Sequence, residues 1–468
     1  MNSSVLQYYR CPEHYLQIAT QGPLSDAGGF FRFGQGIVCF GKSSGQPSKS
    51  PAGALYDAAA DATVKNGVLS LPFDLDDVAA NLRFELYTDF PDANQSWFEA
   101  ISNQIYYFVR PALPVKVRKY LQRVRLSDWS DLPFPHWPVD RTVDDLFEQT
   151  LLLSLKAQGV ERIPFVWFWP EGASGGAIMT HDVETAKGRD FSGTLMDIND
   201  SFGIKASFQV VPETRYEVTP KYLESIAKRG FEVAVQDLNH DGHLYRSREE
   251  FEKRVAKINA YGRKWGAEGF RSAILYRRQE WFGTLEFSYD MSVPNVAHLD
   301  PQRGGCCTVM PYFIGKLLEL PVTITQDYSL FHILQEHSIA LWKRQIELIL
   351  EKHGLISAIV HPDYIMTAPE RQTYEELLSH LVSLRGEKGL WVTTPREVNQ
   401  WWRERAQMNI VEDGGTLRIK GPGSERACIA YASAKDGRLV YTLASKNVNE
   451  RITNPANEGA YYAGGQGQ

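Results

Sequence analysis

The chain has 468 residues, 43% hydrophobic and 23% charged, which is typical of a folded protein of roughly two or three domains. Its formal net charge of −6 gives no electrostatic basis for binding nucleic acid or an anionic membrane. Residues 1–15 lack a basic flank followed by an apolar core, and no apolar run approaches the roughly 20 residues that span a bilayer. We therefore expect a cytoplasmic protein without a signal peptide or membrane span; its oligomeric state is left open.

The five cysteines are odd in number and show no metal-ligand spacing, so reduced thiols are expected. Cys306 and Cys307 are adjacent, and we expect two buried thiols there rather than a strained disulfide.

Residues 1–112 are predicted to form an N-terminal accessory domain, β-rich or α+β. Short strands at 30–33 and 36–40 are bounded by glycine, and a helix is predicted over 76–82. Residues 42–66 are rich in Ser, Gly, Pro and Ala, which indicates a surface loop. No recognisable chemistry lies in this part of the chain.

Residues 113–160 are predicted to be a linker and a helix. The basic stretch from Val115 to Arg125 is typical of a solvated helix face, with an anionic-substrate site as the alternative. Apolar residues from Thr142 to Lys156 repeat at helical spacing, which predicts an amphipathic helix.

Residues 161–405 alternate between predicted strands and helices, which indicates a parallel sheet with crossover helices, either a barrel or an open sheet. The helix after Ser338 has the clearest signals, since Ser338 caps it and Gly354 ends it. Residues 406–468 are predicted to form a small β-rich appendage, with a turn at 435–437 and a frayed tail. The strands predicted in the alternating region are 165–169, 177–180, 205–211, 231–235, 269–271, 308–313, 355–360 and 390–392.

Two acids follow the buried strand at 177–180, in the sequence Thr-His-Asp-Val-Glu from Thr180 to Glu184. Strand alternation places Asp182 and Glu184 on one side and His181 on the other. Neighbouring carboxylates are unfavourable unless a metal or a catalytic role uses them. The alternative is that one acid caps the next helix, but the cluster favours the head of an active site.

Polar residues also follow other predicted strands: His240 lies beyond the strand at 231–235, Arg271 ends 269–271, and His361 follows 355–360. In a barrel these residues and the two acids face one rim. Two acids and a histidine can hold a divalent ion that activates water. A further histidine can protonate a leaving group, and Arg271 can hold a carboxylate in place.

The order of these segments resembles the polysaccharide deacetylase family, whose NodB homology domain is a distorted (β/α) barrel that removes acetyl groups from N-acetylated sugars with a divalent metal. The T-F-D-D motif of the family corresponds to residues 180–184. The H-[ST]-x-x-H motif corresponds to 236–240, with Gln236 in place of the first histidine. The R-x-P motif corresponds to 271–273, and the strand that ends in histidine corresponds to 360–363. The resemblance covers roughly residues 170–405, within the predicted barrel at 161–405, and the T-H-D-V-E form of the first motif indicates a separate subgroup.

The resemblance implies a metal-dependent hydrolase, with zinc as the expected metal and a carbohydrate as the substrate. It implies that Asp182 is the base, that Asp182, Glu184 and His240 bind the metal, that Arg271 positions Asp182, and that His361 is the general acid. Two alternatives stay open: a non-catalytic relative that binds carbohydrate or a protein partner, and a hydrolase of another C–N bond on the same fold.

Other residues have weaker signals. His243 or His181 could replace the ligand missing at Gln236. Trp167 and Trp169 could stack on a sugar ring, although core packing is at least as good an explanation. Asp290 is a candidate to orient His361 by family analogy alone. The polar loops at 300–305 and 326–328 are candidates for substrate contact.

Overall fold

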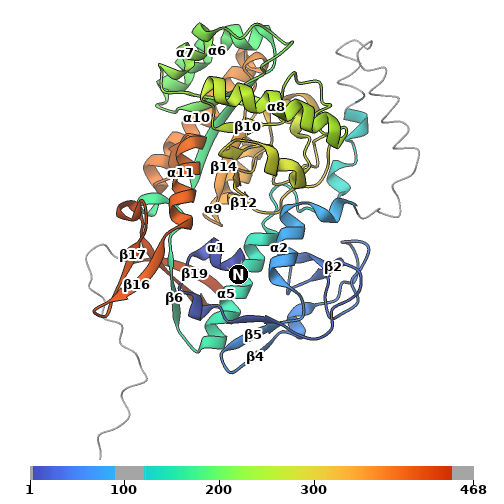
Figure 1. Cartoon of the computed structure of the whole chain (residues 1–468), viewed down its shortest axis with the longest axis vertical. Helices are drawn as coiled ribbons and strands as arrows, with labels where there is room; N and C mark the ends of the chain where they lie inside the picture. The colour runs from blue at the N-terminus through green and yellow to red at the C-terminus, as the bar shows by residue number, and fades with distance from the viewer. Residues whose placement is uncertain (1–3, 90–120, 122, 445–468) are drawn as a thin grey trace, which may run out of the picture.

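The computed structural model describes residues 4–89, 121 and 123–444, which form two lobes (Figure 1). The upper lobe is built on a nine-stranded sheet, and the lower lobe combines N-terminal elements with the helix α5 and two C-terminal strands. The predicted basic stretch lies partly outside the described residues, at 115–120 and 122, and the predicted tail lies outside them from residue 445 onward.

The large sheet has the strand order β12-β13-β11-β10-β9-β8-β7-β14, and β15 also pairs with β7. All pairs are parallel except β12 with β13, as expected for strands joined by crossover helices. The strands are β7 Gly176–Val183, β8 Ala206–Val210, β9 Glu232–Gln236, β10 Gly269–Arg271, β11 Tyr289–Asp290, β12 Tyr312–Ile314, β13 Leu317–Glu319, β14 Leu355–Ile359 and β15 Trp391–Thr393.

The sheet curls so that the region beyond β11 and the strand β14 approach each other through residues 322–324. Val322 forms a parallel bridge with Pro294 just beyond β11. On its other side the same segment joins β14, where the Thr323 hydroxyl donates to the Leu355 carbonyl oxygen at 2.7 Å. The arrangement is a distorted (β/α) barrel, which confirms the predicted fold class.

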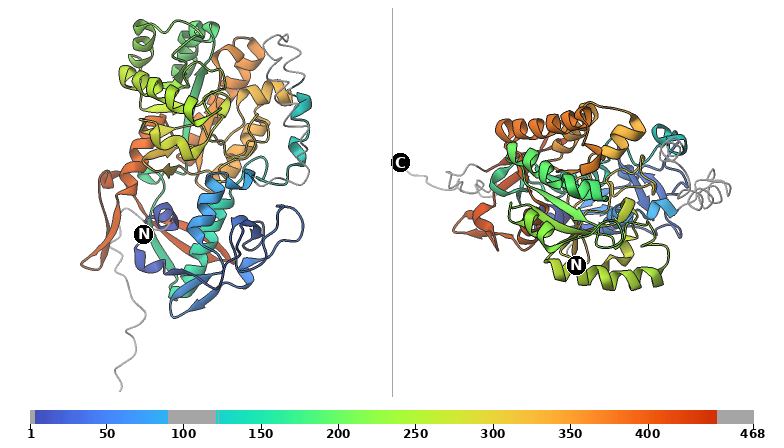
Figure 2. Two further views of the ribbon diagram at one scale, coloured as in Figure 1. Left: turned by 45° about the vertical axis from the view of Figure 1, so that its right-hand side comes forward. Right: turned by 90° about the horizontal axis from the view of Figure 1, so that it is seen from above.

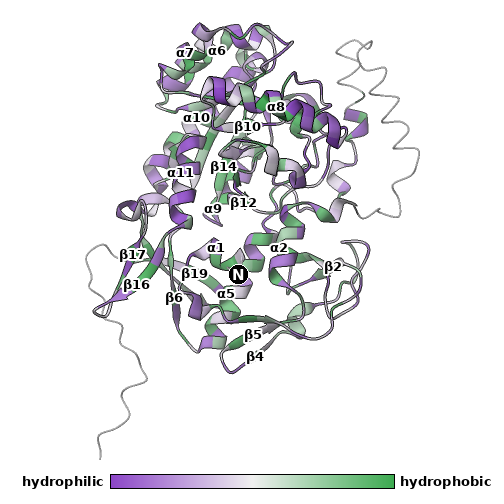
Figure 3. Cartoon of the chain, in the orientation of Figure 1, coloured by the Kyte–Doolittle hydropathy of each residue, from purple (hydrophilic) through white to green (hydrophobic). Residues whose placement is uncertain are grey.

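Helices cover the outside of the barrel, and α8 and α10 flank the central strands on opposite sides when seen from above (Figure 2). Their ends follow local sequence signals: Thr185, Thr219 and Ser247 accept backbone N–H bonds at helix starts. Figure 3 shows hydrophilic residues alternating with hydrophobic ones along α8, whose buried face includes Phe251. The helices are α6 Ala186–Ser201, α7 Pro220–Ala227, α8 Arg248–Trp265, α9 Ala340–Leu350, α10 Ala368–Lys388 and α11 Pro395–Ala406.

The lower lobe contains a three-stranded sheet β1-β5-β4, the hairpin β2–β3 and a second three-stranded sheet β19-β18-β6. The helix α5 contacts β5, β18 and β19 and lies at the centre of this lobe (Figure 1). The hairpin β16–β17, Asn409–Asp413 and Thr416–Lys420, projects beside it. The remaining elements are α1 Ser4–Tyr9, β1 Ile18–Thr20, β2 Gly29–Arg32, β3 Val38–Gly41, β4 Thr63–Lys65, β5 Val68–Leu71, α2 Leu75–Arg83, α5 Thr142–Gln158, β6 Arg162–Val166, β18 Ile429–Lys435 and β19 Arg438–Leu443.

The strand predicted at 165–169 was expected in the barrel, but β6 pairs with β18 in the lower lobe instead. Trp167 and Trp169 follow it and are buried in the core, so they are not available to stack on a sugar. We propose on this pairing that the first barrel residues lie near 170, and that 429–443 form one domain with the N-terminal residues.

Most predicted barrel elements are confirmed within a few residues, as is the helix from Thr142. The strand predicted at 308–313 is wrong: only 312–314 form a strand, at the antiparallel edge of the sheet. The short strands β11 and β13 were not predicted, because two or three residues are too few for a periodic signal.

None of the five cysteines, all within the described residues, forms a disulfide, and Cys306 and Cys307 are both buried, as expected. In the described part of the chain, none of the helices combines the length and apolar character needed to cross a membrane.

Candidate metal centre and catalytic pocket

The strand β7 at the centre of the barrel presents its two faces as the sequence predicts. Thr180 and Asp182 point into the barrel, where both contact Arg271. His181 points outward, bonding the Val360 carbonyl oxygen through Nδ1 and accepting from the Asn199 amide at Nε2. Burial lowers the pKa of His181 to about 3, so its ring is neutral. Because both ring nitrogens face away from the two acids, His181 does not replace the metal ligand that is missing at Gln236.

Arg271 is fully buried at the end of β10 and fixes Asp182. Its Nη1 lies 2.5 Å from Asp182 Oδ1 and 2.8 Å from the Thr180 hydroxyl, and its Nε donates to the Met291 carbonyl oxygen at 2.9 Å. A buried guanidinium that hydrogen-bonds a carboxylate holds it in one orientation. The predicted positioning contact between Arg271 and Asp182 is therefore present.

Glu184 contacts both histidines of the cluster through the same oxygen. Its Oε1 lies 2.6 Å from His240 Nε2 and 3.5 Å from His361 Nε2. Burial raises the pKa of Glu184, but the two histidines outweigh this effect, and the pKa lies well below its usual value. Glu184 is therefore a carboxylate that still reaches solvent, since 18% of its side chain is exposed.

Gln236 lies between the two acids, at the end of β9. Its Nε2 donates to Asp182 Oδ2 at 3.0 Å and to Glu184 Oε1 at 3.1 Å. Among the described residues its Oε1 is buried without a hydrogen-bond partner. An unpaired buried acceptor is unfavourable, and this oxygen would gain from a cation or a water molecule near it.

His361 is held by Asp327, a fully buried residue at the start of the π-helical segment Ser329–Leu334. Asp327 Oδ1 lies 2.7 Å from His361 Nδ1, and Oδ2 accepts the His361 backbone N–H at 2.7 Å. Burial lowers the pKa of His361, but Asp327 and Glu184 raise it far more. The suggestion that Asp290 orients His361 is wrong, because Asp290 bonds Ser292.

The Nδ1 atom of His240 contacts an arginine, whereas that of His361 contacts an aspartate. Arg215 Nη2 donates to His240 Nδ1 at 2.9 Å and to the His240 carbonyl oxygen at 3.0 Å. Because an arginine has no acceptor, Nδ1 must be unprotonated, and the neutral ring carries its proton on Nε2, facing Glu184. Burial lowers the pKa of His240, Glu184 raises it more, and the result lies above the usual value.

Asp182, Glu184 and His361 each offer a ligand atom, and these atoms lie within 4.8 Å of one another. The Nε2 of His361 is free to bind a metal, since Nδ1 is engaged with Asp327, the usual arrangement of a metal-binding histidine. His240 Nε2 carries a proton as long as Arg215 holds Nδ1. Asp182, Glu184 and His361 therefore fit a divalent metal, and the role of His240 as a ligand stays a prediction.

The cluster opens into a pocket of about 580 Å³. Glu184, His240 and His361 line it together with Arg215, Tyr328 and Tyr364. From the predicted polar loops, Pro301 and Gln326 also line it.

His243 does not join the cluster. More than half of its side chain is exposed, and Nδ1 lies 3.5 Å from Asp241. It therefore does not replace the ligand that is missing at Gln236.

Sequence reasoning missed Arg215 as a functional candidate, and it placed Asp327 only in a loop that could contact substrate, not as the partner of His361. Asp327 follows no predicted strand, and Arg215 lies in the loop after β8. A polar residue near the end of a predicted strand was the available signal for Arg215, since it comes five residues after Val210.

No protein-family model matches the sequence, and no curated protein matches it. Among solved structures, a protein assigned as a polysaccharide deacetylase from Mycobacterium smegmatis is 17% identical, with 51% of this chain and 93% of that chain covered and a TM-score of 0.42. Puue allantoinase is 11% identical, with 50% and 92% covered and a TM-score of 0.40. Peptidoglycan deacetylase PdaC from Bacillus subtilis is 12% identical, with 48% and 90% covered and a TM-score of 0.32.

The residues from all four sequence motifs meet in this structure. Asp182, Glu184, Arg271, His240 and His361 come from four separate strand ends and gather at one rim of a curled parallel sheet. In fold and in the order of its motifs, this chain resembles the polysaccharide deacetylase family.

Proposed function

We propose that this protein is a metal-dependent hydrolase that removes N-acetyl groups from a saccharide. The observation that carries the proposal is the group of Asp182, Glu184 and His361, whose ligand atoms lie within 4.8 Å of one another and of which Glu184 and His361 line an open pocket. A cytoplasmic location belongs to the proposal and is supported by the five cysteines of the described residues, which form no disulfide.

Asp182, Glu184 and His361 are the residues that would hold the metal. Zinc is the proposed ion because it accepts carboxylate oxygen and imidazole nitrogen and retains an open position in catalytic sites. When bound, such an ion lowers the pKa of a coordinated water and polarises the amide carbonyl. Arg271 holds Asp182 in one orientation, which suits its proposed role as the base.

The hydrogen-bond partners of the two histidines favour roles that differ from those that the family resemblance implies. His361 has the lone pair of Nε2 available because its other nitrogen faces Asp327. His240 has a proton on Nε2 because its other nitrogen accepts from Arg215. We therefore propose His361 as a ligand and His240 as a hydrogen-bond donor to the substrate through Nε2, while Asp182 passes the proton that it takes from water to the leaving amine.

The test joins metal analysis with product analysis on the purified full-length protein. We expect near-stoichiometric metal in the wild-type protein, with much less in Glu184→Gln, and acetate release from an N-acetylated saccharide. Ammonia release without acetate would instead support a hydrolase of another C–N bond. Binding of saccharide with no product from any substrate would support a non-catalytic relative.

Metal analysis also separates the histidines. We expect His361→Gln to lose metal and His240→Gln to retain it while losing activity. If His240→Gln loses the metal and His361→Gln retains it, this assignment of the two histidines is wrong, and the roles that the family resemblance implies hold.

A further inference from the structure

Arg215 lines the catalytic pocket, and its side chain is directed at a histidine. Its Nη2 atom donates to both Nδ1 and the carbonyl oxygen of His240, at 2.9 and 3.0 Å. A guanidinium offers five N–H donors and no acceptor, so this contact occupies the Nδ1 lone pair of His240. The two bonds together also fix the ring relative to its own backbone.

The contact between these residues lies between two loops that further hydrogen bonds join. The Glu213 backbone N–H donates to the Leu238 carbonyl oxygen at 2.9 Å, and the Thr214 hydroxyl donates to the Asn239 carbonyl oxygen at 3.4 Å. Thr214 and His240 have φ values of 69° and 55°, in the left-handed region. Such conformations are unfavourable for residues other than glycine, and they persist where the surrounding contacts fix the loop.

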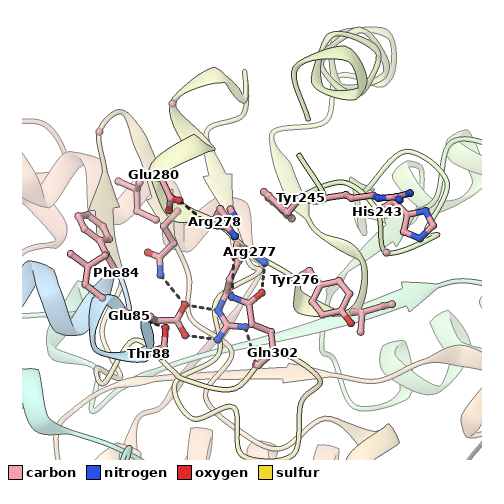
Figure 4. A pocket seen from close by; sticks show the side chains of 18 of the residues that line it. Phe84, Glu85, Thr88, His243, Tyr245, Tyr276, Arg277, Arg278, Glu280 and Gln302 are labelled. Carbon is pink, nitrogen blue, oxygen red and sulfur yellow. Dashed lines mark hydrogen bonds and ion pairs between the residues drawn. The ribbon is translucent and has the colours of Figure 1, made fainter. Parts of the chain in front are cut away.

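The loop at 237–243 is not held by packing alone, because it lines two cavities. One is the catalytic pocket, and the other is a second pocket of about 1400 Å³ that adjoins it at Asp241 and Ile274. Figure 4 shows His243, from the end of this loop, on one side of the second pocket. Hydrogen bonds therefore contribute strongly to the orientation of His240.

The position of the proton on His240 decides how many protein ligands the metal centre can have. Asp182, Glu184 and His361 already supply three ligand atoms. A zinc site that activates water has three protein ligands and an open position, whereas a fourth protein ligand closes the tetrahedron. His240 Nε2 lies 2.6 Å from Glu184 Oε1, so it is close enough to the cluster to become that fourth ligand.

We propose that Arg215 is a positioning residue that keeps one coordination position of the metal open. It occupies Nδ1 of His240, so the neutral ring carries its proton on Nε2 and has no lone pair there for the metal. Without Arg215 the proton can move to Nδ1, and Nε2 becomes a fourth ligand. The inference rests on the metal site of the proposed function, and it adds the residue that sets the number of protein ligands.

The test is a double-mutant cycle on the full chain, in which the apoprotein is titrated with zinc against a competing chelator. Arg215→Met should bind zinc ~10-fold more tightly than the wild-type protein, the lower end of the effect that partners of histidine ligands have. It should also lose hydrolytic activity, because the open position is filled. A purely structural role of Arg215 would instead weaken both.

The second variant of the cycle isolates the histidine. His240→Gln should leave the zinc affinity of the wild-type protein unchanged, but it should remove the gain in Arg215→Met. Arg189→Met is the matched control, because it also removes a positive charge next to this loop. Arg189 donates to the Glu217 carbonyl oxygen at 3.2 Å, and its zinc affinity should stay at the wild-type value.

A gain in zinc affinity that persists in the double variant would overturn the proposal, since the lost charge would then explain it. Unchanged or weaker binding in folded Arg215→Met would overturn it as well. The expected cycle without product from any substrate would reject the proposed function and leave the assignment of Arg215 standing.

A second measurement needs no variant of Arg215. Proton–nitrogen NMR spectra of the wild-type apoprotein at alkaline pH report which ring nitrogen of a neutral histidine carries the proton, and the signals of His240 are those absent from His240→Gln. We expect the proton on Nε2. A proton on Nδ1 would overturn the proposal.

Discussion

Replacement of Asp327 tests the role of His361 most directly. Asp327 is fully buried and accepts both the ring and the backbone N–H of His361 at 2.7 Å. Asp327→Asn retains the shape of the side chain but removes its negative charge. In the wild-type protein this charge orients the ring of His361 and raises its pKa. Loss of such a partner typically lowers metal affinity ~10- to 100-fold, which corresponds to about 1.4–2.7 kcal/mol.

The assay is titration of the apoprotein with zinc against a competing chelator, with thermal unfolding to establish that the variant is folded. Asp290→Asn is the matched control, because Asp290 is equally buried in the barrel but bonds Ser292 instead of His361. We expect zinc affinity to be unchanged in Asp290→Asn. Weaker zinc binding in Asp290→Asn, with wild-type binding in Asp327→Asn, would refute the assignment of His361 as a ligand held by Asp327.

Three further predictions concern other parts of the structure. Gln236→His should raise zinc affinity, measured by the same titration, because an imidazole would replace the amide between the acids; an unchanged affinity would show that residue 236 does not reach the metal. Glu85→Gln should lower the free energy of unfolding by ~3–5 kcal/mol in urea, because it leaves Arg277 buried without its charge partner; a loss below 1 kcal/mol would contradict this. Burial raises the pKa of Asp144 from 3.8 to about 6, so the folded state favours its protonated form. Its stabilising effect is present below about pH 4 and is lost as the pH rises through 6, up to about 3 kcal/mol. Urea unfolding at pH 4–7 should show a flatter dependence in Asp144→Asn, and an identical slope would refute the assignment.

The barrel could be predicted from the sequence because its signals are local. The strands β7 and β14 are continuous apolar runs, and the carboxyl ends of parallel strands must meet at one edge. This reasoning is enough to place Asp182 and His361 at the same rim of the barrel. The helix caps at Thr185 and Ser247 follow the same local chemistry.

The lower lobe could not be predicted in the same way, because its pairings join distant parts of the chain. β6 and β18 are separated by more than 260 residues, and nothing in either strand identifies the other. Arg405 shows the same limit: it is fully buried, and its guanidinium donates to the carbonyl oxygens of Tyr8 and Val166. A charged residue at the end of a predicted helix is normally assigned to the surface.

The site itself shows why Gln236 was hard to interpret from sequence. If Gln236 is counted as a lost ligand, the sequence implies an empty metal site, since a neutral amide binds zinc less well than imidazole. In the structure its amide N–H₂ group instead joins Asp182 to Glu184, which offsets part of the repulsion between two buried carboxylates. His361 can supply the nitrogen that Gln236 does not, because Asp327 fixes its ring with Nε2 toward Glu184. A histidine absent from one motif therefore does not by itself abolish the metal centre, because the geometry of the barrel brings another within reach.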